Sequence, residues 1–390
     1  MLLYTAPKAT VQQVLKSHPV KGHASLCCQV QKVLHHLSRC RTSELGFHLY
    51  RCSDERCGHV QYQYHSCRDR HCPQCGALKK DEWIEARTRE LLPVKYYHVV
   101  FTLPHELNSI VMGHQQLLYK LLFDASAQTL LTFCRDEKYL GAQPGIISVL
   151  HTWGQQLSFH PHIHCIISGG GITAEGKWKE ARKNDWRFLF PVKAMAVVYR
   201  AKFLEALKVW IIKGLVTVPQ HIDVKALLTL LYGKPWVVYA KAPFGGPHTV
   251  IEYLGSYTHK VAISNHRIVS INENEDTVNF QYKDYADCGK QKLMSLQAQE
   301  FIRRFSQHIL PKGFTKIRMY GFLSNRGRQQ RIEEVLEKLQ LPQHAPAVSV
   351  PMAVRLLERY GMQVNKCPCC RASTLELVLI YTPWKKADDG

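Results

Sequence analysis

The chain has 390 residues, of which 46% are hydrophobic and 21% are charged, a composition typical of a soluble globular protein of two or three domains. Its 51 Lys and Arg residues against 31 Asp and Glu give a formal charge of +20, which predicts attraction to a polyanion, with nucleic acid as the first candidate. No run of about eighteen apolar residues and no charged, then apolar leader at Met1 is found, which argues against a membrane protein and predicts a cytoplasmic, nucleoid-associated location.

Residues 1–94 are predicted to form a small helical and zinc-binding domain. Apolar residues recur at three- and four-residue steps as far as about residue 36, which predicts helices. Six of the 14 cysteines then lie between Cys40 and Cys75, at spacings typical of metal ligands rather than of a disulfide framework. The arginines among them give the domain the composition of a nucleic-acid reader that is folded by zinc.

Two pairs of cysteines in this domain are local chelates, Cys52 with Cys57 and Cys72 with Cys75. We expect these four thiolates together to form one closed structural zinc site. The remaining candidates, for a second zinc site, are Cys40, His48, Cys67 and His71. Two alternatives stay open for them, namely ligand exchange within one site and core packing of the two cysteines.

Residues 95–340 are predicted to form a second domain, in which strands and helices alternate irregularly. A strand at 95–103 is followed by a helical segment at 107–134 and by a β-hairpin at 145–167. A further helix at 198–215 precedes a strand at 236–241. The expected fold class is therefore α+β, with the sheet built around the hairpin.

The second strand of the hairpin carries the sequence Phe159-His160-Pro161-His162-Ile163-His164. Because side chains alternate across a strand, His162 and His164 point to one face and are aimed at one metal ion. Pro161 has no N–H to donate, which places His160 in the preceding turn rather than as an equal third ligand. The competing interpretation is a pair of histidines on a solvated sheet face.

A turn at 244–247 is predicted to open a helix that carries Tyr253 and Tyr257, four residues apart on one face. The competing interpretation is core packing, because Val250 and Leu254 form an apolar stripe beside the two rings.

The segment from Phe301 to Ile332 contains no Asp or Glu but many Lys and Arg, with Tyr320 and Phe322 among them. Single-stranded nucleic acid needs such a surface, because cations pair with phosphates and bases stack on rings; a solvated basic surface is the alternative. The residues predicted to contact DNA are Lys260, Arg267, Lys316, Arg318, Arg326 and Arg328. Residues 341–390 are expected to be a C-terminal extension, whose Cys367-Pro368-Cys369-Cys370 cluster is half a metal site with no obvious partner.

Paired histidines, paired tyrosines, a cysteine-rich domain and strong positive charge together fit the nicking of a DNA strand. A tyrosine hydroxyl, with a pKa of about 10, is a poor nucleophile but also a reasonable leaving group, so a covalent phosphotyrosine can form and be reversed. A metal ion at the histidines would polarise the scissile phosphate and orient it for in-line attack.

From about Cys40 to Arg328, the sequence resembles the two-tyrosine HUH transposases of rolling-circle insertion sequences. The motifs that carry the resemblance are Ser66 to Cys75, His151-Thr152-Trp153-Gly154-Gln155, His160 to His164, Pro243-Phe244-Gly245-Gly246-Pro247, Tyr253 and Tyr257 with Val261-Ala262-Ile263-Ser264, and Tyr320-Gly321-Phe322-Leu323-Ser324-Asn325.

This resemblance implies an antiparallel-sheet nuclease domain that holds a divalent cation, Mg or Mn, at His162 and His164. It also implies that Tyr253 and Tyr257 form 5′-phosphotyrosine links to single-stranded DNA, at the ends of the element and at its target. The third metal ligand is not set by the motif, and His151 on the neighbouring hairpin strand is our choice. Strand separation would come from host replication or helicase factors, since the sequence has no helicase motif.

Two other functions remain open at this point. A plasmid rolling-circle replication initiator or a relaxase would use the same nicking chemistry for another purpose. A zinc-dependent DNA-binding regulator would use the histidines and tyrosines only for structure.

Overall fold

The computed structural model describes residues 7, 9–19, 26–75, 83–88, 90–181, 189–241, 244, 249–250, 253, 255, 261–343, 350–351, 354–355, 357–358 and 363–383. The strands are β1 (Phe47–Cys52), β2 (Val60–Tyr64), β3 (Tyr96–Thr102), β4 (Gln143–Trp153), β5 (Phe159–Ile172), β6 (Trp178–Glu180), β7 (Val238–Lys241), β8 (Ile268–Asn272), β9 (Thr277–Asp284), β10 (Lys290–Gln297), β11 (Ile317–Gly321) and β12 (Leu375–Tyr381). The helices are α1 (Val11–Ser17), α2 (Cys28–Ser38), α4 (Asn108–Gly113), α5 (Gln115–Arg135), α6 (Val192–Ile212), α7 (Val224–Gly233), α9 (Ala298–Ser306) and α10 (Arg328–Lys338), with short 3₁₀ turns η2 (Ser43–Leu45), η3 (His105–Leu107) and η5 (Asn265–Arg267).

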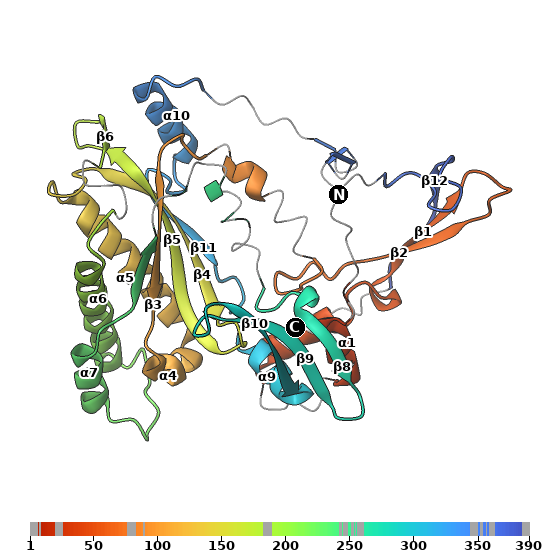
Figure 1. Ribbon diagram of the computed structural model, residues 1–390, viewed down its shortest axis with the longest axis horizontal. Helices are drawn as coiled ribbons and strands as arrows, with labels where there is room; N and C mark the ends of the chain where they lie inside the picture. Colours follow the sequence, from red (N-terminus) through yellow and green to blue (C-terminus); the bar gives the residue numbers. More distant parts are fainter. Residues whose placement is uncertain are drawn as a thin grey trace.

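The largest sheet has the strand order β11-β4-β5-β3-β7, with β6 paired to the far end of β5. All of its pairings are antiparallel. Its centre is the hairpin of β4 and β5, which confirms the hairpin predicted at 145–167. The sheet stands in the left half of Figure 1, with α5, α6 and α7 beside it.

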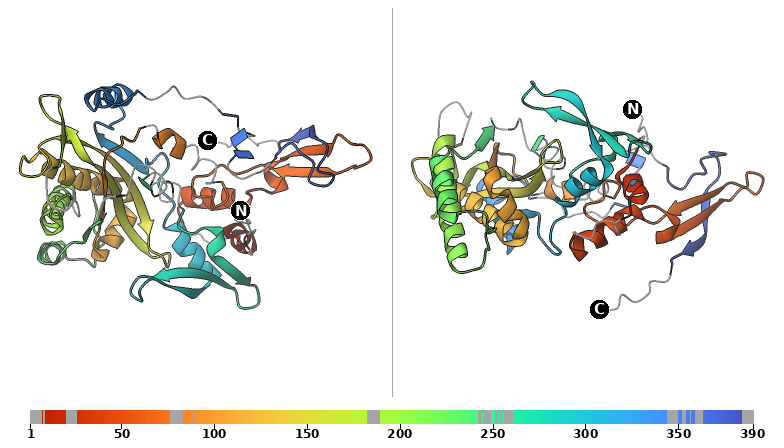
Figure 2. Two further views of the ribbon diagram at one scale, coloured as in Figure 1. Left: turned by 45° about the horizontal axis from the view of Figure 1, so that its top comes forward. Right: turned by 90° about the horizontal axis from the view of Figure 1, so that it is seen from below.

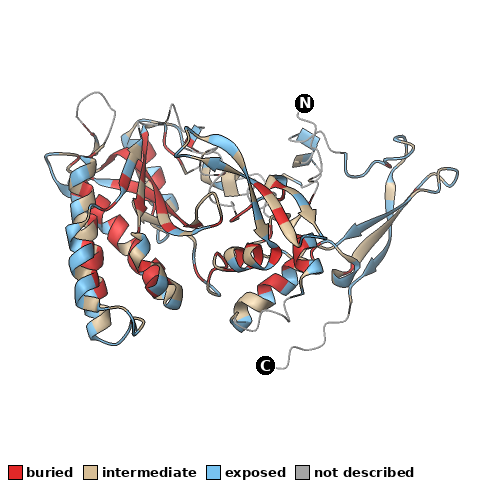
Figure 3. Cartoon of the chain, turned by 60° about the horizontal axis from the view of Figure 1, so that its bottom comes forward, coloured by how far each residue is buried: buried red, intermediate tan, exposed pale blue. Residues whose placement is uncertain are grey.

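One face of this sheet is covered by helices. Residues Ile163, Cys165 and Ile167 of β5 share a buried cluster with side chains of α5 and α6. Figure 3 shows the result, with buried residues on the sheet and on the inner sides of the helices, and exposed residues on the outer side of α6. The odd-numbered residues of β5 therefore belong to the core, and its even-numbered residues face the other way.

A second cluster of buried residues joins two distant parts of the chain. Helices α1 and α2 contribute Val14 and Leu34, and the β8–β10 sheet with α9 contributes Phe280 and Phe301. The predicted domain limits near 94 and 340 stay predictions, but this cluster contains residues from both sides of the first limit.

The third sheet is a ribbon of β1, β2 and β12, which extends away from the rest of the molecule at the right of Figures 1 and 2. Its last strand comes from the C-terminal part of the chain and pairs antiparallel with β1 along its length. The ribbon is poorly buried, since all five residues of β2 are exposed. None of its three strands contributes an apolar side chain to the three buried clusters of the described residues, and Cys52 at the end of β1 is the one buried residue of these strands.

The mixture of helices with three antiparallel sheets confirms the predicted α+β class. Within the described part of the chain, no helix has the length and apolar character needed to cross a membrane.

Candidate active site and metal centres

Three histidines converge on the face of the large sheet that is turned away from α5 and α6. In the antiparallel register His151 of β4 lies directly opposite His162 of β5, and His164 follows two residues later on the same face. The candidate ligand nitrogens of the three rings lie within 4.8 Å of one another. The structure thus brings together the three residues that the sequence proposed as ligands.

A fourth histidine, His98 of β3, extends this cluster. Its Nε2 lies 2.9 Å from Nδ1 of His164, and the two rings are nearly parallel. The hydroxyl of Tyr253 lies 3.0 Å from Nε2 and 3.3 Å from Nδ1 of His98. One predicted nucleophile is therefore linked to the histidine cluster through a single buried imidazole.

Loss of hydration keeps the rings of His98 and His162 neutral. Burial, together with the charges of Lys241 and His162, lowers the pKa of His98 to about 3. Burial lowers the pKa of His162 to about 4, against a smaller opposite effect of the His160 carbonyl. A neutral imidazole has a free lone pair, so His162 is in the form that binds a cation at pH 7.

The backbone of His160 selects which nitrogen of His162 is available. Nδ1 of His162 lies 2.6 Å from the carbonyl oxygen of His160 and donates its proton to it, which leaves Nε2 as the ligand atom. His160 therefore orients a ligand and lies outside the converging group, but its predicted place in a preceding turn is wrong, because β5 begins at Phe159.

The histidines line a pocket of about 500 Å³, which is also lined by the end of β9 with Tyr282 and by the turn after it with Tyr285. Trp153 also lines the pocket and stacks on His151 with ring centroids 4.6 Å apart. The ammonium of Lys316 lies 4.9 Å from the centre of the Trp153 ring, so this predicted DNA-contacting residue lies beside the pocket. Three converging imidazole nitrogens beside open space make a site that can accept a cation and still leave room for a substrate oxygen.

Three other residues predicted to contact DNA have partners within the protein. Arg267 donates to the backbone carbonyls of Gln155 and Gln281. Arg318 lies over the ring of Phe123 near Asp124, and Arg328 pairs with Glu90 at 3.0 Å. Their role in binding DNA stays a prediction, as does that of Arg326, whose side chain is exposed.

The expectation that bases stack on Phe322 and Tyr320 is wrong for Phe322. Its side chain is fully buried in a cluster with Val335 and Leu336 of α10. Tyr320 is also largely covered, and burial raises the pKa of its hydroxyl above the usual range. A ring that is closed off by a helix has no face to offer a base.

Tyr257, Lys260 and the turn at Gly245–Pro247 lie outside the described residues. Of the predicted helix, the described residues Thr249, Val250, Tyr253 and Gly255 are helical. Val250 is fully buried, and Tyr253 packs against the same cluster but stays partly exposed, so the apolar stripe covers the ring of the candidate nucleophile only in part.

The predicted grouping of Cys52, Cys57, Cys72 and Cys75 in one site is wrong. Each local pair stays together, but each finds other partners: the first cluster is Cys40, Cys67, Cys72 and Cys75, and the second is Cys52, Cys57, Cys367 and Cys370. The reason is that β1 and β2 carry the Cys52–Cys57 turn away into the ribbon, where the C-terminal segment arrives beside it.

Sulfur separations in both clusters suit a tetrahedral ion. Sγ of Cys75 lies 3.5 Å from Cys40 and 3.6 Å from Cys67. A Zn–S bond of about 2.3 Å in a tetrahedron puts the sulfurs about 3.8 Å apart, close to these values. Neither of the predicted histidines belongs to a cluster: His71 pairs with Asp69 and accepts from the N–H of Leu310, and His48 packs against His65.

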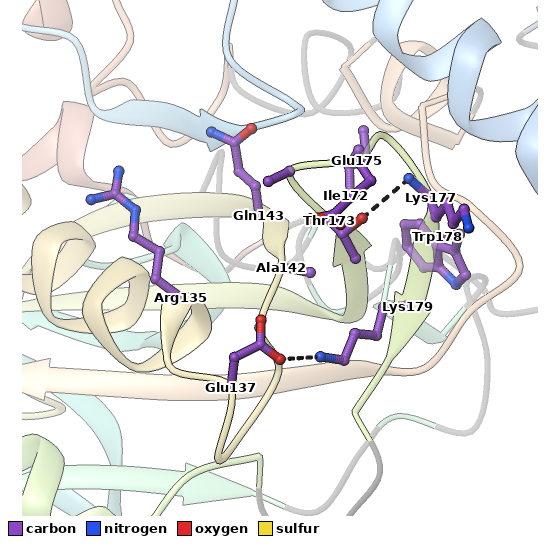
Figure 4. A pocket seen from close by; sticks show the side chains of 12 residues that line it. Arg135, Glu137, Ala142, Gln143, Ile172, Thr173, Glu175, Lys177, Trp178 and Lys179 are labelled. Carbon is purple, nitrogen blue, oxygen red and sulfur yellow. Dashed lines mark hydrogen bonds and ion pairs between the residues drawn. The ribbon is translucent and has the colours of Figure 1, made fainter.

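A further pocket, of about 620 Å³, opens at the other end of β4 and β5. Figure 4 shows its charged lining, in which Lys179 pairs with Glu137 at 2.6 Å. No predicted catalytic or metal-binding residue lines it, so the histidine pocket is the stronger candidate.

Four-thiolate clusters of this geometry define a zinc-binding α+β protein, and comparisons with known proteins identify its family. Residues 10–103 match the family described as "Transposase zinc-binding domain", and residues 145–331 match the family described as "Putative transposase". The chain is 40% identical over 372 residues to "Putative transposase y4qJ" of Sinorhizobium fredii (strain NBRC 101917 / NGR234), covering 92% of this chain and 91% of that protein. It is 29% identical over 349 residues to the "Transposase for insertion sequence element IS801" of Pseudomonas savastanoi pv. phaseolicola, covering 88% of this chain and 81% of that protein.

The chain therefore belongs to this family of insertion-sequence transposases, which confirms the resemblance found in the sequence. A solved structure, "The structure of TrwC complexed with a 27-mer DNA comprising the recognition hairpin and the cleavage site", is 16% identical and covers 28% of this chain and 43% of that one. Its TM-score of 0.22 is too low to carry an argument about this chain.

Proposed function

We propose that this transposase nicks and rejoins single-stranded DNA through 5′-phosphotyrosine intermediates on Tyr253 and Tyr257 during rolling-circle transposition. A divalent cation held by His151, His162 and His164 assists the reaction. The observation that carries the proposal is the chain of contacts from the Tyr253 hydroxyl through His98 to His164. A tyrosine with a purely structural role would not need to be linked to a converging set of histidines.

The ring of His98 can stabilise the attacking form of the tyrosine. If His164 binds the cation through Nε2, its Nδ1 carries a proton and donates it to Nε2 of His98. The proton of neutral His98 is then on Nδ1, which lies 3.3 Å from the tyrosine oxygen and donates to it. A donated hydrogen bond favours the phenolate, which is the nucleophilic form.

Attack by Tyr253 forms an O–P bond to the scissile phosphate and breaks the bond from phosphorus to the 3′ oxygen. The hydroxyl proton passes to bulk water, and the leaving 3′ oxygen takes one up. When bound, the cation supplies charge that stabilises the phosphate oxygens in the transition state. Of the two predicted ions, Mn²⁺ suits three nitrogen donors better than Mg²⁺, whose protein ligands are oxygens.

Two tyrosines permit strand transfer without a free end. While one tyrosine holds a cleaved strand, the other can cut a second strand at the same cation, if both hydroxyls lie on one face of their helix. Tyr257 enters the proposal through the sequence motif. Lys316 lies over Trp153, which lines the histidine pocket, so its ammonium can contact a phosphate of the bound strand.

The first cysteine cluster is the structural zinc site of the N-terminal module in this proposal. Cys40, Cys67, Cys72 and Cys75 present four sulfurs to one point, and Cys72 is fully buried beside α1, where Gln12 donates to its sulfur. Zinc there would fold the module that contacts DNA.

The proposal is tested by incubating the full chain with a single-stranded oligonucleotide that carries an element end and with Mn²⁺. We expect a covalent protein–DNA adduct on a denaturing gel. Tyr253→Phe and Tyr257→Phe should each keep some single cleavage, and the double variant should form no adduct. Phe keeps the ring, so a loss of activity does not come from a cavity.

Two controls separate chemistry from binding. Tyr232→Phe changes an exposed tyrosine on α7 and should leave the adduct unchanged. His162→Ala with His164→Ala should remove the adduct but retain binding to the oligonucleotide. An adduct that persists in the double Phe variant would show that the nucleophile is elsewhere, and DNA binding without any adduct from the wild type would favour a non-catalytic regulator.

A further inference from the structure

The second cysteine cluster joins segments at opposite ends of the chain. Cys52 and Cys57 lie in the N-terminal ribbon, and Cys367 and Cys370 lie in the C-terminal segment. The last two residues are outside both stretches that match transposase families, 10–103 and 145–331. Nothing in the nicking mechanism uses them.

The four sulfurs of this cluster are placed as ligands of one ion. Sγ of Cys52 lies 3.7 Å from Cys370, and Sγ of Cys57 lies 3.8 Å from Cys367, against about 3.8 Å expected for a tetrahedral Zn–S₄ site. Cys52 and Cys367 are almost fully buried although they lie in a ribbon with little core. Converging buried thiols in an otherwise exposed sheet indicate a metal rather than packing.

The backbone around the cluster is also arranged for thiolates. Each pair lies on a tight turn, and the residue after the second cysteine, Gly58 or Arg371, has a positive φ. The amide of Asp54 donates to the sulfur of Cys52, and that of His59 donates to Cys57. The amides of Ser373 and Ala372 donate to Cys370 in the same way. Hydrogen bonds to sulfur are the usual outer partners of a metal-bound thiolate.

Pairing of the strands brings the two turns together. Cys52 at the end of β1 lies opposite Leu375 at the start of β12, and the N–H of Ser53 donates to the carbonyl of Thr374 at 2.9 Å. The turn that contains Cys367 and Cys370 directly precedes this point. The cluster therefore depends on the register of β1 with β12 and cannot form within either segment alone.

We propose that Cys52, Cys57, Cys367 and Cys370 bind a second structural Zn²⁺, which fastens the C-terminal strand β12 to the N-terminal ribbon. The four thiols release their protons as the ion binds. A two-stranded ribbon without a core is marginal in water, and the third strand and the ion together supply its stability. This inference does not depend on the nicking mechanism.

The test uses the full wild-type chain, kept reduced and saturated with zinc. Metal analysis should find two zinc ions per chain after subtraction of any zinc bound at the histidine site, which is measured as the difference from the His162→Ala, His164→Ala variant. A thiol-alkylating reagent followed by peptide mass spectrometry should leave Cys52, Cys57, Cys367 and Cys370 unmodified, and a strong chelator should make all four reactive. Exposed cysteines outside both clusters, Cys27, Cys28 and Cys288, should react in either state.

Variants give a second readout with a matched control. Cys367→Ser with Cys370→Ser should lower the zinc content from two to one and make Cys52 and Cys57 reactive, while Cys40 and Cys72 stay protected. Cys369→Ser changes an exposed cysteine of the same turn and should retain two zinc ions. One zinc per wild-type chain, or alkylation of Cys367 and Cys370 in zinc-saturated protein, would overturn the proposal.

Discussion

At the residue scale, His98 is the side chain on which the proposed chemistry depends most and which the sequence pattern did not single out. It is 2% exposed and contacts both Tyr253 and His164. In the proposed mechanism its Nε2 accepts a hydrogen bond from His164, a proposed metal ligand, and its Nδ1–H donates to the hydroxyl of Tyr253. Its removal should therefore affect the rate of cleavage more than the binding of DNA.

We expect His98→Leu to slow formation of the covalent adduct by about 10- to 100-fold, the usual effect of removing a group that orients a metal ligand. His98→Gln keeps an N–H donor and should lose less. Single-turnover cleavage assays give the rates, and oligonucleotide binding should be unchanged in both variants. His105→Ala, at a histidine with 81% side-chain exposure, serves as the control. Equal rates for the wild type and His98→Leu would remove this residue from the mechanism.

Alternation along a strand was enough to predict His162 and His164, and the hairpin register made His151 a reasonable third choice. His98 was within a correctly predicted strand, yet its place beside His164 follows from the pairing of β3 with β5. Strand pairing is a non-local property that one sequence does not specify. The available signal was an imidazole in the interior of a strand made mainly of aromatic and β-branched residues.

At the scale of elements, the end of β11 shows how closely the large sheet is packed. Gly321 has φ of +65°, and a Cβ atom there would lie 1.7 Å from the carbonyl oxygen of Pro144 on β4. No side chain fits unless the two strands separate. Gly313 has a similar φ of +72°, but nothing lies within 4 Å of its Cβ position.

This pair of glycines gives a prediction with its own control. Gly313→Ala should lower the free energy of unfolding by about 1–2 kcal/mol, the cost of the left-handed conformation alone. Gly321→Ala should lower it by about 3 kcal/mol or more, because the β11–β4 pairing must also yield. Urea unfolding in zinc-containing buffer measures both. Equal midpoints for the two variants would mean that the sheet edge adapts without cost.

The segment from Phe301 to Ile332 shows where composition misleads. Its cations and rings were predicted to form a surface for single-stranded DNA, but β11 lies between α5 on one face and α10 on the other. Arg318 is held against Phe123, and Phe322 fills a core. Charge and aromatic content do not say which faces of an element are covered, and here tertiary packing decides.

At the scale of the whole molecule, the formal charge of +20 predicts binding to DNA that depends strongly on salt. If about four phosphates of a single strand are neutralised, raising NaCl from about 50 mM to about 200 mM should weaken binding by about 50-fold. Fluorescence anisotropy with a labelled oligonucleotide measures this. The His162→Ala, His164→Ala variant should show the same salt dependence. Affinity that is independent of salt would show that the charge plays no part.

The metal sites were predicted only in part, again because some of their residues are far apart in the sequence. Local spacing correctly grouped Cys52 with Cys57 and Cys72 with Cys75, because a chelating pair is formed within one turn. It could not reveal that Cys52 meets Cys370, a residue 318 positions later. Contact between these two residues depends on the fold of the whole chain between them.

The pairing of β1 with β12 also has a consequence for the order in which the protein is made. The first strand leaves the ribosome early, but its partner is synthesised more than 300 residues later. At a rate of about 5–20 residues per second, the ribbon waits roughly 15–60 s for its third strand. A chain that stops short of β12, through a premature stop codon or a stalled ribosome, retains an uncovered edge on β1, so completion of the ribbon reports that translation has passed Tyr381.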